Sequence, residues 1–165
     1  MPLTAPESSP PLVPHEETVR PEWIDYNGHM NVAYYVLAFD HATDKLLDVL
    51  GIGEAYRRDE NGSFFVVESH VVYRRELRVG DSMRIETEIL DHDNKRLHGF
   101  SRMFRAADGE VAASYEFLGL HMDMTARRAA PFPAPALARI RALAARQNAR
   151  PRPTEAGMSV RIPTR

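Results

Sequence analysis

The stretch N-V-A-Y-Y-V-L-A-F-D-H-A-T-D-K-L-L-D-V-L-G, from Asn31 to Gly51, decides the fold. Its apolar side chains recur with the 3.6-residue period of a helix, at Val32, Tyr35, Val36, Phe39, Leu46, Leu47 and Leu50. Asn31 is a preferred residue at the start of a helix, and Gly51 is typical of the position just after its end. The pattern predicts one long helix with a single buried face.

The residues on either side of this helix predict strands. The stretch 15–23 before it carries apolar side chains on alternate positions. After it, four stretches rich in β-branched and aromatic residues are separated by short turns with glycine, aspartate or asparagine: 63–78, 81–90, 96–106 and 111–122. This order predicts an α+β fold in which an antiparallel sheet wraps the long helix.

Proline marks both ends of the predicted domain. Residues 1–14 hold five prolines and no apolar core that would make a signal peptide, so we expect a disordered lead. A second proline cluster at 131–135 precedes an alanine- and arginine-rich helix over 136–149, and 150–165 is expected to be irregular. The expected organisation is therefore a lead (1–14), one domain (15–124) and a basic extension with a helix (125–165).

Composition narrows the function. The chain of 165 residues has no cysteine, so disulfides and thiolate chemistry are excluded. No run of eighteen apolar residues occurs, so we expect no membrane segment and a cytoplasmic protein. Residues 125–165 carry nine arginines and one glutamate, which gives this segment a net charge of +8. Since the net charge of the whole chain is −2, residues 1–124 carry −10. An acidic domain, and a tail whose arginines are not interleaved with aromatic residues, argue against a nucleic-acid partner.

The turn W-I-D-Y-N-G-H-M-N, from Trp23 to Asn31, places an acid just before the helix. The first backbone N–H groups of a helix, here those of Asn31, Val32 and Ala33, have no partner inside it. A carboxylate at Asp25 and these donors would face one small volume, where the donors stabilise an oxyanion and the acid attacks a carbonyl or activates water. Equally, these residues could form an ordinary turn and N-cap without any catalytic role.

The motif D-Y-N-G-H-M-N, followed by Y-R-R-E-L-R-V-G-D at 73–81, resembles the acyl-CoA thioesterases of the hotdog fold, in the group similar to 4-hydroxybenzoyl-CoA thioesterase. The segments R-P-E-W-I-D-Y-N-G-H-M, A-T-D-K-L-L, K-R-L-H-G-F and R-P-R-P-T-E-A-G are similar to the betainyl-CoA thioesterase branch associated with carnitine dehydrogenase. Many hotdog relatives read His-Val-Asn-Asn where this chain has His29-Met30-Asn31-Val32, so the second asparagine side chain is absent.

The resemblance implies roles for residues of the turn. Asp25 would be the nucleophile or general base, Gly28 the tight-turn glycine, and the Val32 N–H the donor to the thioester carbonyl. It also implies hydrolysis of a short acyl-CoA without a cofactor, since coenzyme A is part of the substrate. Two alternatives stay open: a non-catalytic acyl-CoA sensor, and an enoyl-CoA hydratase in which His29 supplies a second protonating group.

Further candidates would bind substrate. Glu68 and His70 share a strand face, and with Trp23, Tyr34 and Tyr35 they add an acid and aromatic rings of the kind that hold a quaternary ammonium. Because Tyr34 and Tyr35 are adjacent on a helix, at most one of them lines a pocket.

Coenzyme A and a second copy of the chain are the expected partners. The phosphates of coenzyme A would meet the tail or nearby basic residues: Arg74, Arg75, Arg78, Lys95 and Arg96. No metal is predicted, since no ligand-like spacing is found at His41, His92, His98 and His121. A single short sheet leaves an exposed apolar edge, which predicts a homodimer or homotetramer.

Overall fold

The computed structural model describes residues 12–163. Most of the predicted lead lies outside them, but Val13 and Pro14 already belong to strand β1, Val13–Thr18. The predicted strand over 15–23 is therefore wrong at both ends. Val13 is buried in the core, and the chain turns into a short 3-10 helix, Pro21–Trp23, once the strand has ended.

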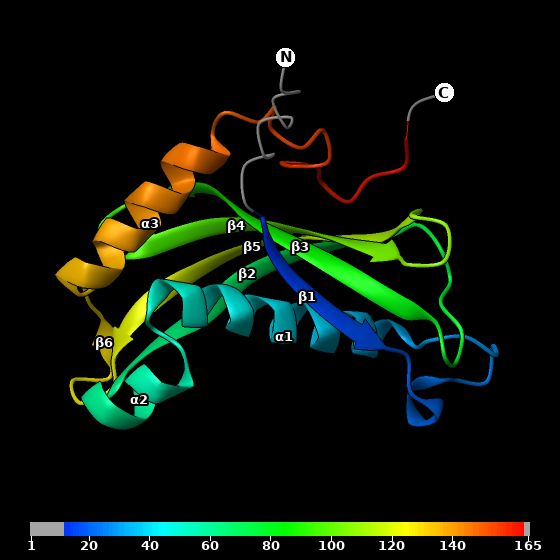
Figure 1. The fold of residues 1–165 in the computed structure, drawn as a ribbon, viewed down its shortest axis with the longest axis horizontal. Coiled ribbons are helices and arrows are strands. Elements are labelled where there is room, and N and C mark those ends of the chain that lie inside the picture. The colour runs from blue at the N-terminus through cyan, green and yellow to red at the C-terminus, as the bar shows by residue number, and fades with distance from the viewer. Residues whose placement is uncertain (1–11, 164–165) are drawn as a thin grey trace, which may run out of the picture.

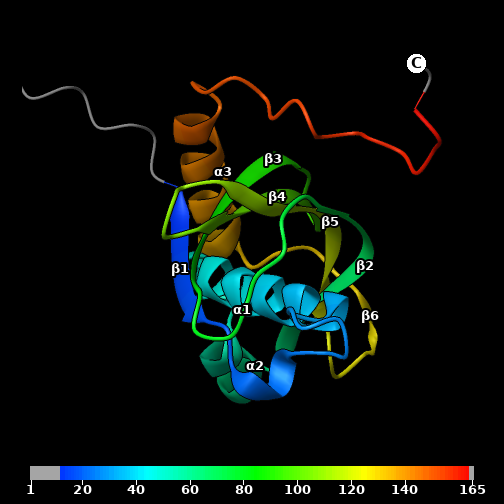
Figure 2. The same ribbon diagram turned by 90° about the vertical axis from the view of Figure 1, so that its right-hand side faces the viewer.

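One curved sheet forms the body of the molecule (Figures 1 and 2). The other strands are β2, Gly62–Tyr73; β3, Ser82–His92; β4, Arg96–Arg105; β5, Val111–Asp123; and β6, Arg128–Ala129. All pairings are antiparallel, the order is β1-β3-β4-β5-β2, and β6 pairs with β5. The strands β1 and β2 thus end this path on opposite sides, as Figure 2 shows.

The predicted long helix is α1, Val32–Leu50, and it lies along one face of the sheet (Figure 1). Its stop is also confirmed, since Gly51 has a φ of 75°, a left-handed conformation that favours glycine. On the buried side, Phe39 stacks on Tyr115 of β5 with 5.1 Å between ring centroids. This packing buries the predicted apolar stripe from Tyr35 to Leu50, whereas Val32 and Val36 of the same stripe are 55% and 39% exposed.

The C-terminal helix α3, Ala134–Gln147, packs against the edge of the same core. Ile140 is fully buried, and the side chain of Gln147 accepts a hydrogen bond of 2.8 Å from the backbone N–H of Ile89 in β3. Arg139 donates to the carbonyl oxygen of Leu50 at 3.4 Å, at the end of α1. The helix therefore closes one end of the core.

Two further segments differ from the sequence prediction. Residues 74–78 were predicted to continue a strand, but β2 ends at Tyr73. The chain leaves the sheet because Leu77 turns inward and is fully buried, with its N–H bonded to the hydroxyl of Tyr35. A short helix, α2, Glu54–Glu60, was not predicted. No helix among the described residues is long and apolar enough to cross a membrane.

Candidate active site

A tight turn brings Asp25 back to the start of α1. Ile24 and Met30 form a β-bridge, and inside it the N–H of Asp25 donates to the carbonyl of His29 at 3.1 Å. Gly28 closes the turn with a φ of 81°, and its N–H donates to the carbonyl of Asp25 at 3.0 Å. Only glycine adopts this backbone conformation without steric cost, which confirms its predicted turn role.

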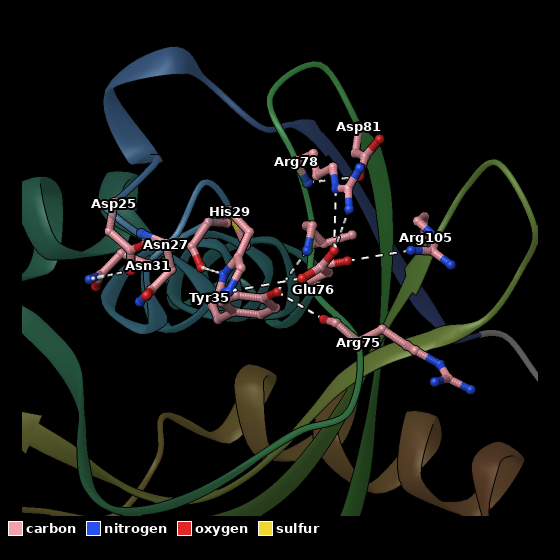
Figure 3. A network of polar contacts seen from close by, with 12 residues as sticks. Asp25, Asn27, His29, Asn31, Tyr35, Arg75, Glu76, Arg78, Asp81 and Arg105 are labelled. Carbon is pink, nitrogen blue, oxygen red and sulfur yellow. Dashed lines mark hydrogen bonds and ion pairs between the residues drawn. The ribbon is translucent and has the colours of Figure 1, made fainter.

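The side chain of Asn31 connects Asp25 to the helix (Figure 3). Its amide nitrogen donates to Asp25 Oδ2 at 3.2 Å, and its amide oxygen accepts from the N–H of Ala33 at 2.9 Å. The other carboxylate oxygen, Oδ1, accepts from the N–H of Asn27 at 2.8 Å. Both oxygens of the half-buried carboxylate are therefore held in place, one asparagine side chain away from the first helical turn.

One free backbone donor remains at this helix end. Three were predicted, but Asn31 N–H donates to the carbonyl of Trp23 at 2.9 Å, and Ala33 N–H is capped as described. Val32 N–H has no acceptor within residues 12–163. It lies at the positive end of a 19-residue helix, where a developing negative charge is stabilised.

A groove of about 200 Å³ opens beside Val32 and brings together five of the predicted residues. It is lined by His29, Met30, Val32, Tyr35, Tyr73, Arg74, Arg75 and Glu76. Met30, Tyr73 and Glu76 were missed, although Met30 lies in the turn motif before α1 and the other two lie in the 73–81 motif. Their place in these motifs could have marked them as candidates. The spacing of residues along the sequence does not reveal that the loop after β2 folds back over the start of α1.

Tyr35 positions this loop and does not present an open ring to a ligand. It is 3% exposed, and burial raises the pKa of its hydroxyl. That hydroxyl donates to the carbonyl of Arg75 at 2.9 Å and accepts from Leu77 N–H at 3.1 Å. The ring of Tyr73 meets it edge to face, with centroids 5.2 Å apart, and is 44% exposed. Tyr73 is therefore the more accessible tyrosine of the groove.

The predicted aromatic site around Trp23 is wrong, because the chain itself fills it. Trp23 is 3% exposed and stacks on Tyr34 with 5.4 Å between centroids and 10° between planes. The guanidinium of Arg20 lies 5.3 Å from the Trp23 centroid. The cation that this ring attracts is thus an internal arginine.

Glu68 and His70 share a face, as predicted, but it is the face away from α1. His70 pairs with Glu116 and Glu68 with Leu118. Directly paired residues of an antiparallel sheet lie on the same face. Tyr115, the neighbour of Glu116 along β5, points to the opposite face, where it stacks on Phe39 of α1. Both residues line a separate groove with His98 and the C-terminal segment. They therefore lie apart from the groove beside Val32.

The predicted phosphate-binding residues differ in whether their side chains are already paired with an acid. Arg78 pairs with Glu76 at 2.7 Å, which lowers the pKa of that glutamate, and Arg96 bonds to Asp93 at 2.6 Å. Arg75 is 3.7 Å from Glu110. The side chain of Arg74 makes no ion pair in the described part of the chain, so it remains open to an anion.

Comparison with known proteins agrees with this arrangement. Residues 19–140 match the thioesterase-like superfamily. The chain is 37% identical to betainyl-CoA thioesterase of Pseudomonas aeruginosa over 92% of its own length and 96% of that protein. It is 35% identical to L-carnitine dehydrogenase/betainyl-CoA thioesterase of Rhizobium meliloti, over 84% of this chain and 28% of the longer relative.

A solved structure shows the same likeness. A hypothetical protein from Staphylococcus aureus, solved in complex with CoA, superposes with a TM-score of 0.88 at 28% identity, covering 96% of this chain and all of that one. A curved antiparallel sheet around one central helix is the hotdog architecture, here that of a thioester hydrolase. The chain belongs to the thioesterase-like superfamily. This membership favours hydrolysis over the sensor and hydratase alternatives.

Proposed function

We propose that this thioester hydrolase acts on a short acyl-CoA in the groove beside Val32, with Asp25 as the catalytic carboxylate. The observation that carries the proposal is the Asn31 side chain, which holds the carboxylate and caps the same helical turn that offers the free Val32 N–H. The thioester carbonyl oxygen would accept from this N–H. Asp25 is not among the residues that line the groove, so the acyl carbon would have to lie between the groove and the turn for the acid, or a water that it activates, to reach it.

The chemical step follows from these two groups. Asp25 attacks the acyl carbon directly, or takes a proton from a water that attacks it, and the carbonyl electrons move to an oxyanion held by Val32 N–H. When the oxyanion collapses, the carbon–sulfur bond breaks, and coenzyme A leaves as a thiolate that then takes up a proton. In the direct route, water afterwards hydrolyses the mixed anhydride and restores the carboxylate.

Asp25→Asn tests the proposal, because the amide keeps the size and an acceptor for Asn27 N–H. We expect kcat for coenzyme A release to fall by about 100-fold or more, with an unchanged fold. Asp59→Asn removes an exposed carboxylate from α2 and is the matched control. Near-normal turnover by Asp25→Asn would refute the assignment. Turnover in H₂¹⁸O that leaves ¹⁸O in Asp25 would identify direct attack, with water hydrolysing the anhydride at the Asp25 carbonyl carbon.

A betainyl group is the acyl group that the relatives support, since two carry betainyl-CoA thioesterase in their names. The net charge of −10 over residues 1–124 favours a cation. In the groove, the exposed ring of Tyr73 replaces the predicted Trp23 site as the candidate that holds it. Each cation–π contact contributes about 0.5 to 2 kcal/mol.

The test of this preference compares betainyl-CoA with uncharged 3,3-dimethylbutyryl-CoA, which has nearly the same shape. We expect a higher kcat/KM for the cationic substrate, and Tyr73→Leu should narrow the ratio. Equal values for the two substrates would discard the cationic acyl group and leave thioester hydrolysis standing.

A homodimer is the assembly that the exposed surface supports. β2 is an edge strand, and it exposes Phe65 (41%), Val66 (37%) and Val67 (54%). An apolar edge with unpaired backbone groups is a template for pairing with a second copy. Two copies joined along β2 would place Tyr73, the last residue of the strand, and the adjoining groove near the subunit boundary.

A further inference from the structure

Three potential metal ligands meet between the edge strand β1 and helix α1, away from the groove beside Val32. His15 and Glu17 are two residues apart on β1, so their side chains share a face, and His41 reaches them from α1. His15 Nε2 lies 3.1 Å from Glu17 Oε2, and His41 Nδ1 lies 3.0 Å from the same oxygen. Ligand atoms of all three residues lie within 4.8 Å of one another.

These separations are those of atoms that share one ion. Zinc bonds to nitrogen and oxygen of about 2.0 to 2.2 Å set neighbouring ligand atoms about 3.0 to 3.5 Å apart around a tetrahedral or octahedral centre. The two distances from Glu17 Oε2, 3.0 and 3.1 Å, fall in this range. The ligand atoms of His15 and His41 lie within 4.8 Å of each other.

We propose that His15, Glu17 and His41 bind one divalent transition-metal ion, with Zn²⁺ as the probe. Two imidazoles and one carboxylate form a donor set that suits zinc and its neighbours, while Mg²⁺ prefers oxygen ligands alone. Three protein ligands leave at least one position of the ion open to water or to another ligand.

The surroundings leave room for that open position. His15 and His41 line a groove of about 590 Å³ along the second half of α1, together with Asp44, Lys45, Asp48, Glu54 and Arg57. The three acids outnumber the two basic residues, which favours a cation there. The nearest positive side chain to Glu17 is that of Arg20, with Nη2 at 4.0 Å from Oε1; it is 59% exposed and can move aside.

The three side chains are also held in position before any ion arrives. The side chains of His15 and Glu17 are 14% and 11% exposed, whereas that of His41 is 37% exposed and leaves a path inward. The pKa of Glu17 is lowered: burial raises it, but the hydrogen bonds from His41 and His15 outweigh burial. The same two hydrogen bonds orient the Glu17 carboxylate. A bound ion would join an edge strand to the central helix.

Calorimetric titration of the tag-free, EDTA-treated protein with ZnCl₂ tests the proposal. We expect one saturable Zn²⁺ site per chain and no binding of Mg²⁺. The affinity for Zn²⁺ should be at least about 100-fold weaker in Glu17→Gln and in His41→Gln. Loss of a residue that only supports a metal ligand causes a smaller drop in affinity. His98→Gln removes the imidazole of another histidine–glutamate pair, 2.7 Å from Glu116, and should bind Zn²⁺ like the original chain.

Imidazole ¹⁵N resonances provide a second measurement on the unaltered protein, so the test does not depend on the folding of a variant. Zn²⁺ should shift the signals of His15 and His41 and leave that of His98 in place. The proposal is overturned if the unaltered chain shows no saturable uptake, or if folded Glu17→Gln and His98→Gln bind Zn²⁺ equally. In that case the three residues form a hydrogen-bonded link between β1 and α1. Neither result depends on thioesterase activity.

Discussion

Replacing Asn31 by serine would separate the two contacts of this side chain. Asn31 accepts the Ala33 N–H at 2.9 Å as an N-cap, and it donates to Asp25 Oδ2 at 3.2 Å. A serine hydroxyl also caps the helix, but it is too short to reach Asp25. Asn31→Ala removes both contacts. Comparing the two variants therefore isolates the positioning of the carboxylate from the stability of α1.

The expected magnitudes follow from these contacts. A hydrogen bond to a charged group contributes about 1.5 to 3 kcal/mol, which corresponds to about 10-fold to 100-fold in rate. Because Asp25 Oδ1 keeps its bond from Asn27 N–H, we expect the lower end, about a 10-fold fall in kcat, for either variant. Loss of the cap in Asn31→Ala costs about 1 kcal/mol, or about 2 to 4 °C in Tm for a chain of this size. Asn31→Ser should keep its Tm.

The assay follows coenzyme A release with a thiol reagent, and calorimetry gives the Tm. A double variant, Asp25→Asn with Asn31→Ser, should lose little more than Asp25→Asn alone, because Asn31 acts through that carboxylate. If Asn31→Ser has the original kcat, or if the losses in kcat follow the losses in Tm, then Asn31 does not position the acid.

The remaining predictions concern binding, assembly and pH. Arg74→Gln should raise KM for acyl-CoA about 10-fold at constant kcat. Arg78→Gln is the control, because the Arg78 side chain is already paired with Glu76, and equal KM values for the two variants would exclude a phosphate contact by Arg74. Val67→Glu should halve the mass measured by light scattering. Val49 on α1 is also 54% exposed, and Val49→Glu should leave the mass unchanged. An unchanged mass in both variants would place the interface elsewhere. Burial raises the pKa of Glu88, so its charge penalises the fold as pH rises through that pKa. Glu88→Gln should therefore raise Tm at pH 8 and leave it unchanged at pH 4, and the same change at both values would contradict this.

The local sequence was sufficient for α1 and for the turn before it. The 3.6-residue pattern, the cap at Asn31 and the stop at Gly51 are all short-range features, so they can be recognised without knowing what packs against them. The same holds for Gly28, whose positive φ is a property of the turn. Residues 74–78 were misread as strand because their exit from the sheet depends on Leu77, which is drawn into the core beneath Tyr35.

The contacts around the candidate site were decided by tertiary structure. Nothing in the spacing shows that Arg20 covers Trp23, that Glu68 faces away from α1, or that Asn31 leaves only Val32 N–H free. In the same way, His15 and Glu17 lie 24 or more residues before His41, and only the packing of β1 on α1 unites them. Local pattern determines which element forms, because backbone preferences act over a few residues. Which side chains meet depends on how the sheet curves around the helix, and that is set by the burial of the whole core.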